Sequence, residues 1–474
     1  MIFTTFEFLL FFMIVLGVRQ TLSSFPAEKW FLLIASYLFY MSWSIPCGAL
    51  IFASSIVDYW VGLRLGRLED PRKRKFLLVV SIVINLGFLG FFKYTNFLLD
   101  NLEWGLGAFG LHVNPWHYDI LLPVGVSFFT FQSMSYTIDV YRREIDPCRN
   151  LRDFLLFVSF FPQLVAGPIV RAKDFLPQLY TKVRASAADV EAGLAQFAVG
   201  AVKKCVISDQ IAPSVDLIYA SPSSYDGLTL FLGALGYSVQ IYCDFSGYSD
   251  MAIGCARIMG YRFLENFQMP YSAVNITEFW RRWHISLSSW FRDYVYIPLG
   301  GNRQGIGRTY CNLLVTMLLC GLWHGASWNF VLWGALHGVA LALHRLWGRG
   351  EVASHADRSY IENLIVTLPA RTLTLAVVVV GWILFRCPTL PEAWTYISRM
   401  TMCTSEGVRM LSPHILGAIL VVVGVHMCIQ KNRLWSEETT TKSIQVRLIS
   451  YSSLMVIISL FSVLESSPFI YFQF

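Results

Sequence analysis

The sequence predicts an all-α, polytopic integral membrane protein. Hydrophobic residues make up 55% of its 474 positions and charged residues only 14%, and the mean hydropathy is +0.52. These values lie outside the range of soluble domains. Apolar stretches near the length needed to cross roughly 30 Å of hydrocarbon recur along nearly the whole chain. They leave no room for a large soluble domain, so we expect a single membrane domain over residues 1–474.

Twelve apolar segments account for the expected helices. The five clearest are Phe3–Val18, Trp30–Trp43, Cys47–Leu65, Phe76–Phe92 and Leu121–Val140. The later ones are Phe154–Val165, Leu228–Cys243, Cys311–Trp323, Trp328–Leu346, Leu373–Phe385, Leu411–Ile429 and Leu448–Leu464. Several are too short to cross a bilayer untilted. Short pieces interrupted by proline or glycine, such as "FVSFFPQLVAGP", predict re-entrant or buried helices packed inside protein.

Basic loops predict the orientation of the chain. The loop Arg64–Lys75 holds six lysines or arginines, whereas Asp100–Asp119 holds none, so the first is expected inside and the second outside. Counting back three spans places the amino terminus outside, on a retained helix rather than a cleaved signal. The net charge of +6 reflects this inner-face excess and implies no nucleic-acid partner. The ten cysteines form no CxxC pair or His/Cys cluster, so neither disulfides nor a metal site are expected.

The densest polar stretch runs from Asn275 to Arg308. On a continuous helix its tryptophans and other large apolar residues fall on one arc, with the arginines outside it. This pattern predicts an amphipathic helix lying at the inner membrane interface. His284 falls at the edge of the aromatic arc, where an imidazole meets both water and the membrane. A snorkelling histidine and a functional one are equally compatible with that position.

His324 lies in a predicted membrane hairpin. Arginines flank the Cys311–Leu346 region on both sides, which places both ends inside. The ascending limb, Cys311–Trp323, is about 20 Å long and shorter than the hydrocarbon core, so its apex is expected within the membrane. His324 sits at that apex beside small residues that open space and interrupt helical bonding, and an ionisable group at such depth indicates function. His337, on the opposite side of a continuous helix, is expected to be a packing histidine.

The two histidines suit one kind of chemistry. A buried neutral imidazole can accept the proton of a hydroxyl whose oxygen attacks a carbonyl, and a water-poor pocket protects a thioester from hydrolysis. No Gly-x-Ser-x-Gly elbow or Cys/His pair supports a covalent serine or cysteine route. His324 and His284 are therefore the predicted centre of acyl transfer from a donor inside to an acceptor outside.

These motifs resemble the membrane-bound O-acyltransferase family, in its bacterial branch of alginate O-acetyltransferases and teichoic-acid D-alanyl transfer proteins. The resemblance rests on "EFWRRWHISLSSWFRDYVYIPLGG", "GLWHGASWNFVLWGALHG", "FVSFFPQLVAGPI", "YCDFSGYSDMAIG" and the ending "SPFIYFQF". It implies that His324 matches the family's catalytic histidine and His284 its second active-site position, within a catalytic region of about residues 120–345. It also implies a helical ring around a thin central region, with a tunnel through the membrane.

The resemblance implies a multi-pass protein of the bacterial inner membrane. Such proteins take an acetyl group from a cytoplasmic donor, with acetyl-CoA the implied substrate and no bound cofactor, and pass it to periplasmic proteins that acetylate alginate or cellulose. Three alternatives stay open: D-alanyl transfer, a polysaccharide exporter or transporter without acyl chemistry, and a scaffold of a secretion complex. D-alanyl transfer serves teichoic acids through a carrier protein. Hydrolysis or transfer of acetyl from acetyl-CoA by the purified protein separates acyl transfer from export alone. The scaffold predicts that replacing His324 leaves polymer acetylation unchanged.

Other polar residues have two interpretations each. Asp244, Ser246, Ser249 and Asp250 favour a loop or helix cap over a pocket role, and Gln132, Ser133 and Asp139 share that ambiguity. Arg303 and Arg308, beside flexible glycines, suit the phosphates of coenzyme A, although a plain inner loop explains them too. Tyr471 in the aromatic ending belongs either to an interfacial belt or to an acyl relay whose phenol carries the ester.

Overall fold

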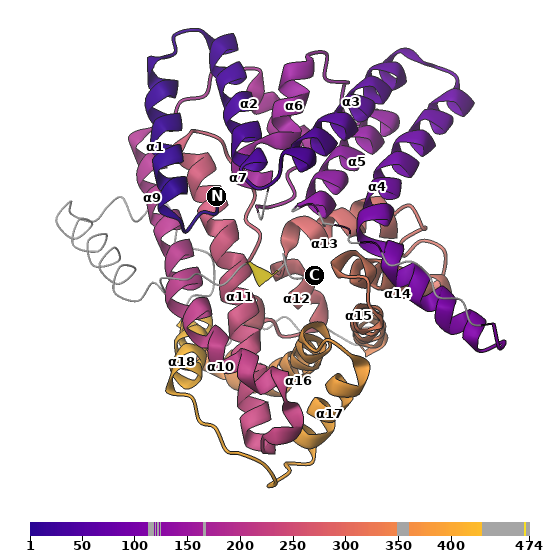
Figure 1. Ribbon diagram of the computed structural model, residues 1–474, viewed down its shortest axis with the longest axis vertical. Coiled ribbons are helices and arrows are strands. Elements are labelled where there is room, and N and C mark those ends of the chain that lie inside the picture. The colour runs from indigo at the N-terminus through magenta and orange to yellow at the C-terminus, as the bar shows by residue number, and fades with distance from the viewer. Residues whose placement is uncertain are drawn as a thin grey trace. The chain divides into compact units, whose positions relative to one another are not determined.

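The described part of the chain is helical. The computed structural model describes residues 1–111, 118, 120, 123, 125–164, 167–347, 360–428 and 469–470. Within these ranges the only pairing of extended residues is an isolated bridge between Tyr225 and Val408. The predicted all-α class is therefore confirmed (Figure 1). The predicted segment Leu448–Leu464 lies outside the described residues.

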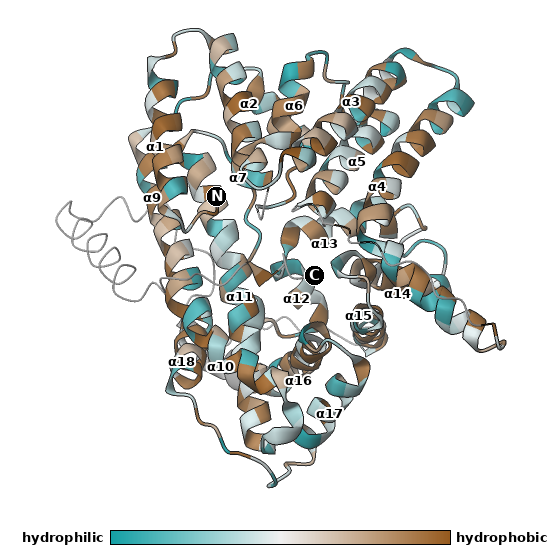
Figure 2. Cartoon of the chain, viewed as in Figure 1, coloured by the Kyte–Doolittle hydropathy of each residue, from teal (hydrophilic) through white to brown (hydrophobic). Residues whose placement is uncertain are grey.

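Six helices among the described residues are long and apolar enough to cross a membrane, which supports the predicted polytopic architecture. They are α3 (Ile45–Arg67), α4 (Pro71–Gly107), α11 (Gly227–Ile258), α14 (Ile306–His324), α15 (Trp328–Trp347) and Val366–Arg386 of α16 (Tyr360–Arg386). The shorter α18 (Pro413–Cys428) is also apolar. Figure 2 shows mostly hydrophobic residues along α1 (Phe6–Thr21) and α4, and hydrophilic residues where α3 joins α4.

The chain forms two compact units, of which the first comprises Met1–Phe197 and Ser249–Leu264. Its other elements are α2 (Phe25–Met41), α5 (Val126–Arg142), α6 (Leu151–Ser159), α7 (Phe161–Leu164), α8 (Ala172–Phe175), η1 (Leu176–Leu179) and most of α9 (Ala187–Ala201). Its interior includes polar groups. The Asp58 carboxylate accepts hydrogen bonds from Ser81 Oγ at 2.6 Å and from Asn85 Nδ2 at 2.9 and 3.0 Å. Donors from neighbouring helices thus satisfy a carboxylate that burial alone would make costly.

The short segment after α5 behaves as its sequence predicts. The phrase "FVSFFPQL" forms α6 and α7 with a break at Phe160, and all of its residues are buried. Gln132 from α5 donates from Nε2 to the carbonyl of Phe157 at 2.6 Å, which ties α5 to this segment. These helices are interior elements rather than lipid-facing spans.

The second unit comprises Ala198–Tyr248 and Glu265–Phe474. Its remaining elements are η2 (Val202–Ser208), α10 (Asp209–Ala220), η3 (Pro222–Ser224), η4 (Pro270–Ser272), α12 (Ile276–Arg282), α13 (Ile285–Phe291), η5 (Arg292–Tyr296) and α17 (Leu390–Thr401). Hydrogen bonds from Thr229 and Arg409 hold the pKa of Asp226, just before α11, down to about 2. That carboxylate fastens the start of α11 to the segment before α18.

The stretch Asn275–Arg308 is not the single amphipathic helix that its aromatic pattern predicts. It divides into α12, α13 and η5, with a break at Trp283 and His284. The backbone NH of Ile285 donates to the carbonyl of Asn266 at 2.9 Å instead of continuing the helical ladder. The large rings of the predicted interfacial arc, such as Trp283 and Trp290, are buried inside the protein. Tertiary contacts with residue 266 therefore override the local helical period.

Candidate active site

The hairpin that carries His324 is present, but its geometry differs from the prediction. α14 and α15 pack against each other, and the helix breaks at residues 325–327 as expected. α14 begins at Ile306, has 19 residues and is about 28 Å long. The predicted limb, Cys311–Trp323, leaves out the polar first residues of this helix. The expectation that the limb ends inside the membrane because it is short is therefore wrong. The burial of His324 follows from its contacts instead.

Small residues close this hairpin rather than open space in it. A Cβ on Gly321 would lie 2.1 Å from the carbonyl oxygen of Phe330, and one on Gly325 would lie 2.0 Å from the ring of Phe330. Only a residue without a side chain permits such an approach of two helices. The expected cavity beside His324 is filled by the Phe330 ring, and the result is a tightly packed turn.

Aromatic rings surround His324, the last residue of α14. The imidazole centroid lies 4.9 Å from Trp323, 4.9 Å from Trp333 and 5.1 Å from Phe385, each in an edge-to-face arrangement. Only 4% of the residue is exposed. These rings come from α14, α15 and α16, so three helices jointly exclude water from the imidazole.

His284 occupies the break between α12 and α13. Its φ of +42° is rare for a residue with a side chain, and it is fully buried rather than placed at the membrane interface as expected. Its ring packs edge-on against Phe245, with centroids 4.6 Å apart. Burial lowers the pKa of His284 to about 3, so this imidazole is neutral at physiological pH.

Asn266 selects the tautomer of His284. The Asn266 Oδ1 atom lies 3.2 Å from His284 Nδ1 and also accepts from the backbone NH and Oγ of Ser286, at 3.1 and 2.9 Å. An amide oxygen only accepts hydrogen bonds, so Nδ1 carries the proton and Nε2 carries the lone pair. The local sequence gives no signal for Asn266, because its role depends on a contact across 18 positions.

The structure brings the two predicted histidines to one site. Trp323 lies beside both of them, with ring centroids 6.1 Å from His284 and 4.9 Å from His324. His337 belongs to the adjoining cluster. It is fully buried against Trp333 at 4.7 Å and Trp280 at 5.2 Å. Among the described residues, neither of its ring nitrogens has a hydrogen-bond partner.

A cavity of about 670 Å³ lies beside α14. Three arginines line it, Arg281, Arg292 and Arg345, together with Cys320, which is one helical turn before His324. Arg303 and Arg308 do not line it and are exposed. In the sequence, the arginines of this cavity indicate only the inner side of the membrane.

The segment "YCDFSGYSD" lies in the middle of α11 and is not the expected loop or cap. Asp244 is buried there because Lys204 Nζ lies 2.7 Å from its Oδ1, and the same ammonium lies 2.8 Å from Asp209 Oδ1. A buried cation from another element makes a mid-helix carboxylate tolerable. The expectation failed because that cation lies 40 positions away.

Asp244 also holds the end of the chain. Its Oδ2 accepts the backbone NH of Ile470 at 2.9 Å. The Phe469 ring lies 4.6 Å from Tyr248 and 5.5 Å from Phe245, the residue that packs on His284. Residues 469 and 470 are thus placed beside the histidine site, whereas the predicted relay Tyr471 lies outside the described residues. No group of three or more His, Cys, Asp or Glu side chains that could hold a metal ion occurs among those residues.

The site thus consists of two buried histidines beside Trp323, of which His284 is neutral, in a many-helix membrane protein. Comparison with known proteins identifies the class. Residues 142–368 match the model of the membrane-bound O-acyltransferase family, and the chain belongs to this family. The predicted resemblance is confirmed, and the protein is an O-acyltransferase.

Relatives from several bacteria show the same relationship. The chain is 43% identical over 404 residues to "Probable alginate O-acetylase AlgI" of Pseudomonas aeruginosa, covering 84% of this chain and 75% of the relative. It is 36% identical over 400 residues to the peptidoglycan O-acetyltransferase of Helicobacter pylori, with 78% and 73% covered. The teichoic acid D-alanyltransferase of Bacillus subtilis is 29% identical over 250 residues, with 50% and 62% covered.

Proposed function

We propose that this protein takes an acetyl group from cytoplasmic acetyl-CoA and passes it across the bacterial inner membrane for O-acetylation of an exported polysaccharide. The single observation that carries this proposal is the pair of buried histidines around Trp323. The relatives named for alginate and peptidoglycan acetylation support the acceptor class. Alginate is the first acceptor to test, and cellulose the second.

In the proposed reaction His324 is the general base. It takes the proton of an acceptor hydroxyl while that oxygen attacks the thioester carbonyl of acetyl-CoA. The tetrahedral intermediate then expels the coenzyme A thiolate, which takes the proton back from the imidazolium. The new bond is the acetyl ester and the broken bond is the thioester. Neutral His284 is the second residue of the proposed site, and the aromatic rings exclude the water that would hydrolyse the thioester.

The donor is proposed to enter through the 670 Å³ cavity. Arg281, Arg292 and Arg345, which line it, suit the phosphates of coenzyme A, because guanidinium groups bind phosphate in a bidentate way. The pantetheine arm would then extend toward Cys320. Arg303 and Arg308 remain proposed donor contacts from the sequence, with an exposed position outside the cavity lining.

Tyr471 is the proposed acyl relay on the outer side. The hydrogen bond between Ile470 and Asp244 and the contacts of Phe469 support this proposal, because they hold the preceding residues beside the histidine site. A phenol can carry the acetyl ester and release it to a periplasmic acetylation protein. Tyr471→Phe is expected to block polymer acetylation, with the exposed Tyr118→Phe as the control. Mass spectrometry should find acetylated Tyr471 when the acceptor is absent, and full acetylation by the Phe variant would refute the relay.

The function is tested in a bacterium that exports alginate and lacks its own membrane O-acetylase. The native protein should restore polymer acetylation. His324→Ala should lower it by at least about 100-fold at an equal amount of folded protein in the membrane, the usual contribution of a general base, and His284→Ala should lower it severely. His337→Ala is the matched control, a buried histidine of the same hairpin, and should retain transfer per folded molecule. Normal acetylation with His324→Ala at an equal amount of folded protein would exclude His324 as the base.

A further inference from the structure

A second cavity lies apart from the donor cavity and shares none of its lining residues. It has a volume of about 560 Å³ and is bounded by α11, η4, α12, α16 and α18. Its walls are largely aliphatic, and the residues that form them are Leu235, Val239, Leu368, Leu375, Ile419, Val422 and Val423. Leu368 and Val423 are 56% and 48% exposed. Because α16 is long and apolar enough to cross a membrane, we expect these exposed walls to face hydrocarbon.

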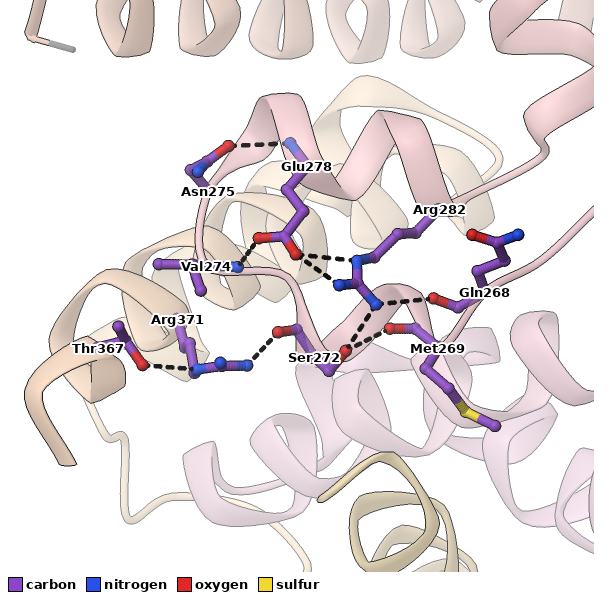
Figure 3. A network of polar contacts seen from close by, with 9 residues as sticks. All are labelled: Gln268, Met269, Ser272, Val274, Asn275, Glu278, Arg282, Thr367 and Arg371. Carbon is purple, nitrogen blue, oxygen red and sulfur yellow. Dashed lines mark hydrogen bonds and ion pairs between the residues drawn. The ribbon is translucent and has the colours of Figure 1, made fainter. Parts of the chain in front are cut away.

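The polar end of this cavity carries more positive than negative charge. Figure 3 shows the ion pair between Arg282 and Glu278. Nη2 and Nε of Arg282 donate to Oε1 of Glu278 at 2.6 and 3.0 Å. Arg371 is held differently. Its Nε donates to Thr367 Oγ1 at 2.9 Å and its Nη1 donates to the carbonyl of Ser272.

The charge of Arg371 is thus not neutralised. Within the described ranges of the chain, no carboxylate pairs with Arg371. The polar end of the cavity therefore holds two guanidinium groups and one carboxylate, which pairs with Arg282 alone, and the local charge is positive. The two neutral oxygens that Arg371 contacts fix the orientation of its guanidinium without supplying an anion.

His426 adds a buried polar group to the same cavity. Its Nδ1 donates to the carbonyl of Val422 at 2.9 Å, and its ring stacks on Tyr271 with centroids 5.6 Å apart. Because Nδ1 holds the proton, Nε2 of the neutral ring carries a lone pair. The residue is 95% buried, and among the described residues this nitrogen has no hydrogen-bond partner.

We propose that this cavity binds an anionic phospholipid. The phosphodiester pairs with Arg371, and an acyl chain lies along the apolar walls of α16 and α18. A free phosphate would leave the aliphatic walls uncovered, and an uncharged lipid would leave Arg371 without an anion. Basic pockets between membrane helices bind lipid headgroups through this combination of charge and apolar surface. The proposal does not depend on the acetyl-transfer reaction.

Native mass spectrometry of the purified full chain tests the proposal with dioleoylphosphatidylglycerol. We expect one tightly bound lipid, with affinity about tenfold lower for dioleoylphosphatidylcholine, which has the same chains and no net charge. Arg371→Gln should weaken phosphatidylglycerol binding about tenfold, the effect expected for one charge-assisted contact, and Arg371→Lys should weaken it less. The control Arg67→Gln removes the same charge from an exposed residue at the end of α3 and should change nothing.

Two further measurements keep the proposal falsifiable if Arg371→Gln folds poorly. Val423→Trp should fill the exposed side of the cavity and displace the lipid while leaving Arg371 in place. Glycerol phosphate at millimolar concentration should not compete with the lipid. Equal binding of phosphatidylglycerol by the native protein and by folded Arg371→Gln would overturn the proposal, as would equal binding of the two lipids or full displacement by glycerol phosphate.

Discussion

Asn266 is the most informative residue to change, because it holds His284 without belonging to the proposed reaction. Asn266→Ala removes one oxygen that faces three donors, His284 Nδ1, Ser286 N and Ser286 Oγ, at 2.9 to 3.2 Å. At about 1 kcal/mol for each hydrogen bond, the expected loss of stability is about 3 kcal/mol. The imidazole also loses the contact that fixes its tautomer. We expect the rate of acetyl transfer per folded molecule to fall about 10- to 100-fold.

The control is Asn85→Ala in the first unit. Asn85 is equally buried and also makes three hydrogen bonds, two to Asp58 and one to the carbonyl of Ser81. Thermal unfolding in detergent should show similar destabilisation of both variants, but only Asn266→Ala should lower kcat for polymer acetylation in membranes. Asn266→Asp keeps an acceptor oxygen and should recover part of the rate. Native turnover by Asn266→Ala, or an equal loss of turnover in Asn85→Ala, would refute the role assigned to this contact.

Three other changes have defined outcomes. Gly321→Ala should lower the temperature midpoint of unfolding, because its Cβ would lie 2.1 Å from a carbonyl oxygen of α15. The control Gly87→Ala, whose Cβ would have no atom within 4 Å, should be neutral or slightly stabilising. Equal midpoints for the two variants would contradict the tight packing of the hairpin. Asp226→Asn should lower the free energy of unfolding at neutral pH. Because the pKa of Asp226 is depressed to about 2 in the folded protein, the difference in unfolding free energy between variant and native protein should shrink as pH falls from about 4 to 2. A difference that stays constant with pH would show that the Asp226 carboxylate is not its cause. Arg345→Gln should raise KM for acetyl-CoA with little change in kcat, and an unchanged KM would remove this arginine from the donor site.

Composition and local pattern predicted the helical membrane class and the break after His324. Both depend on short-range features: apolar length decides membrane insertion, and "GAS" interrupts a helix. His324 and His284 were predictable as site residues because ionisable side chains are rare within apolar sequence. The structure places both beside Trp323, but their catalytic roles remain proposals.

Long-range contacts caused the errors. The break at His284 depends on Asn266, and the burial of Asp244 in mid-helix depends on Lys204. Asn266 and Lys204 lie too far along the sequence to affect the hydrophobic periodicity from which a helix is predicted. The cavity arginine Arg345 was equally ambiguous, because a basic residue at a helix end serves topology and phosphate binding alike, and only the cavity separates the two.

Single-turnover cleavage of acetyl-labelled acetyl-CoA shows whether His324 is the base for acetyl transfer. Purified protein in lipid nanodiscs is mixed with labelled donor and its acceptor, and loss of thioester and gain of labelled ester are measured together. The account predicts that the native protein converts thioester into ester stoichiometrically, that His324→Ala slows this step by at least about 100-fold, and that His337→Ala does not. Ester formation by folded His324→Ala at the native rate would contradict it.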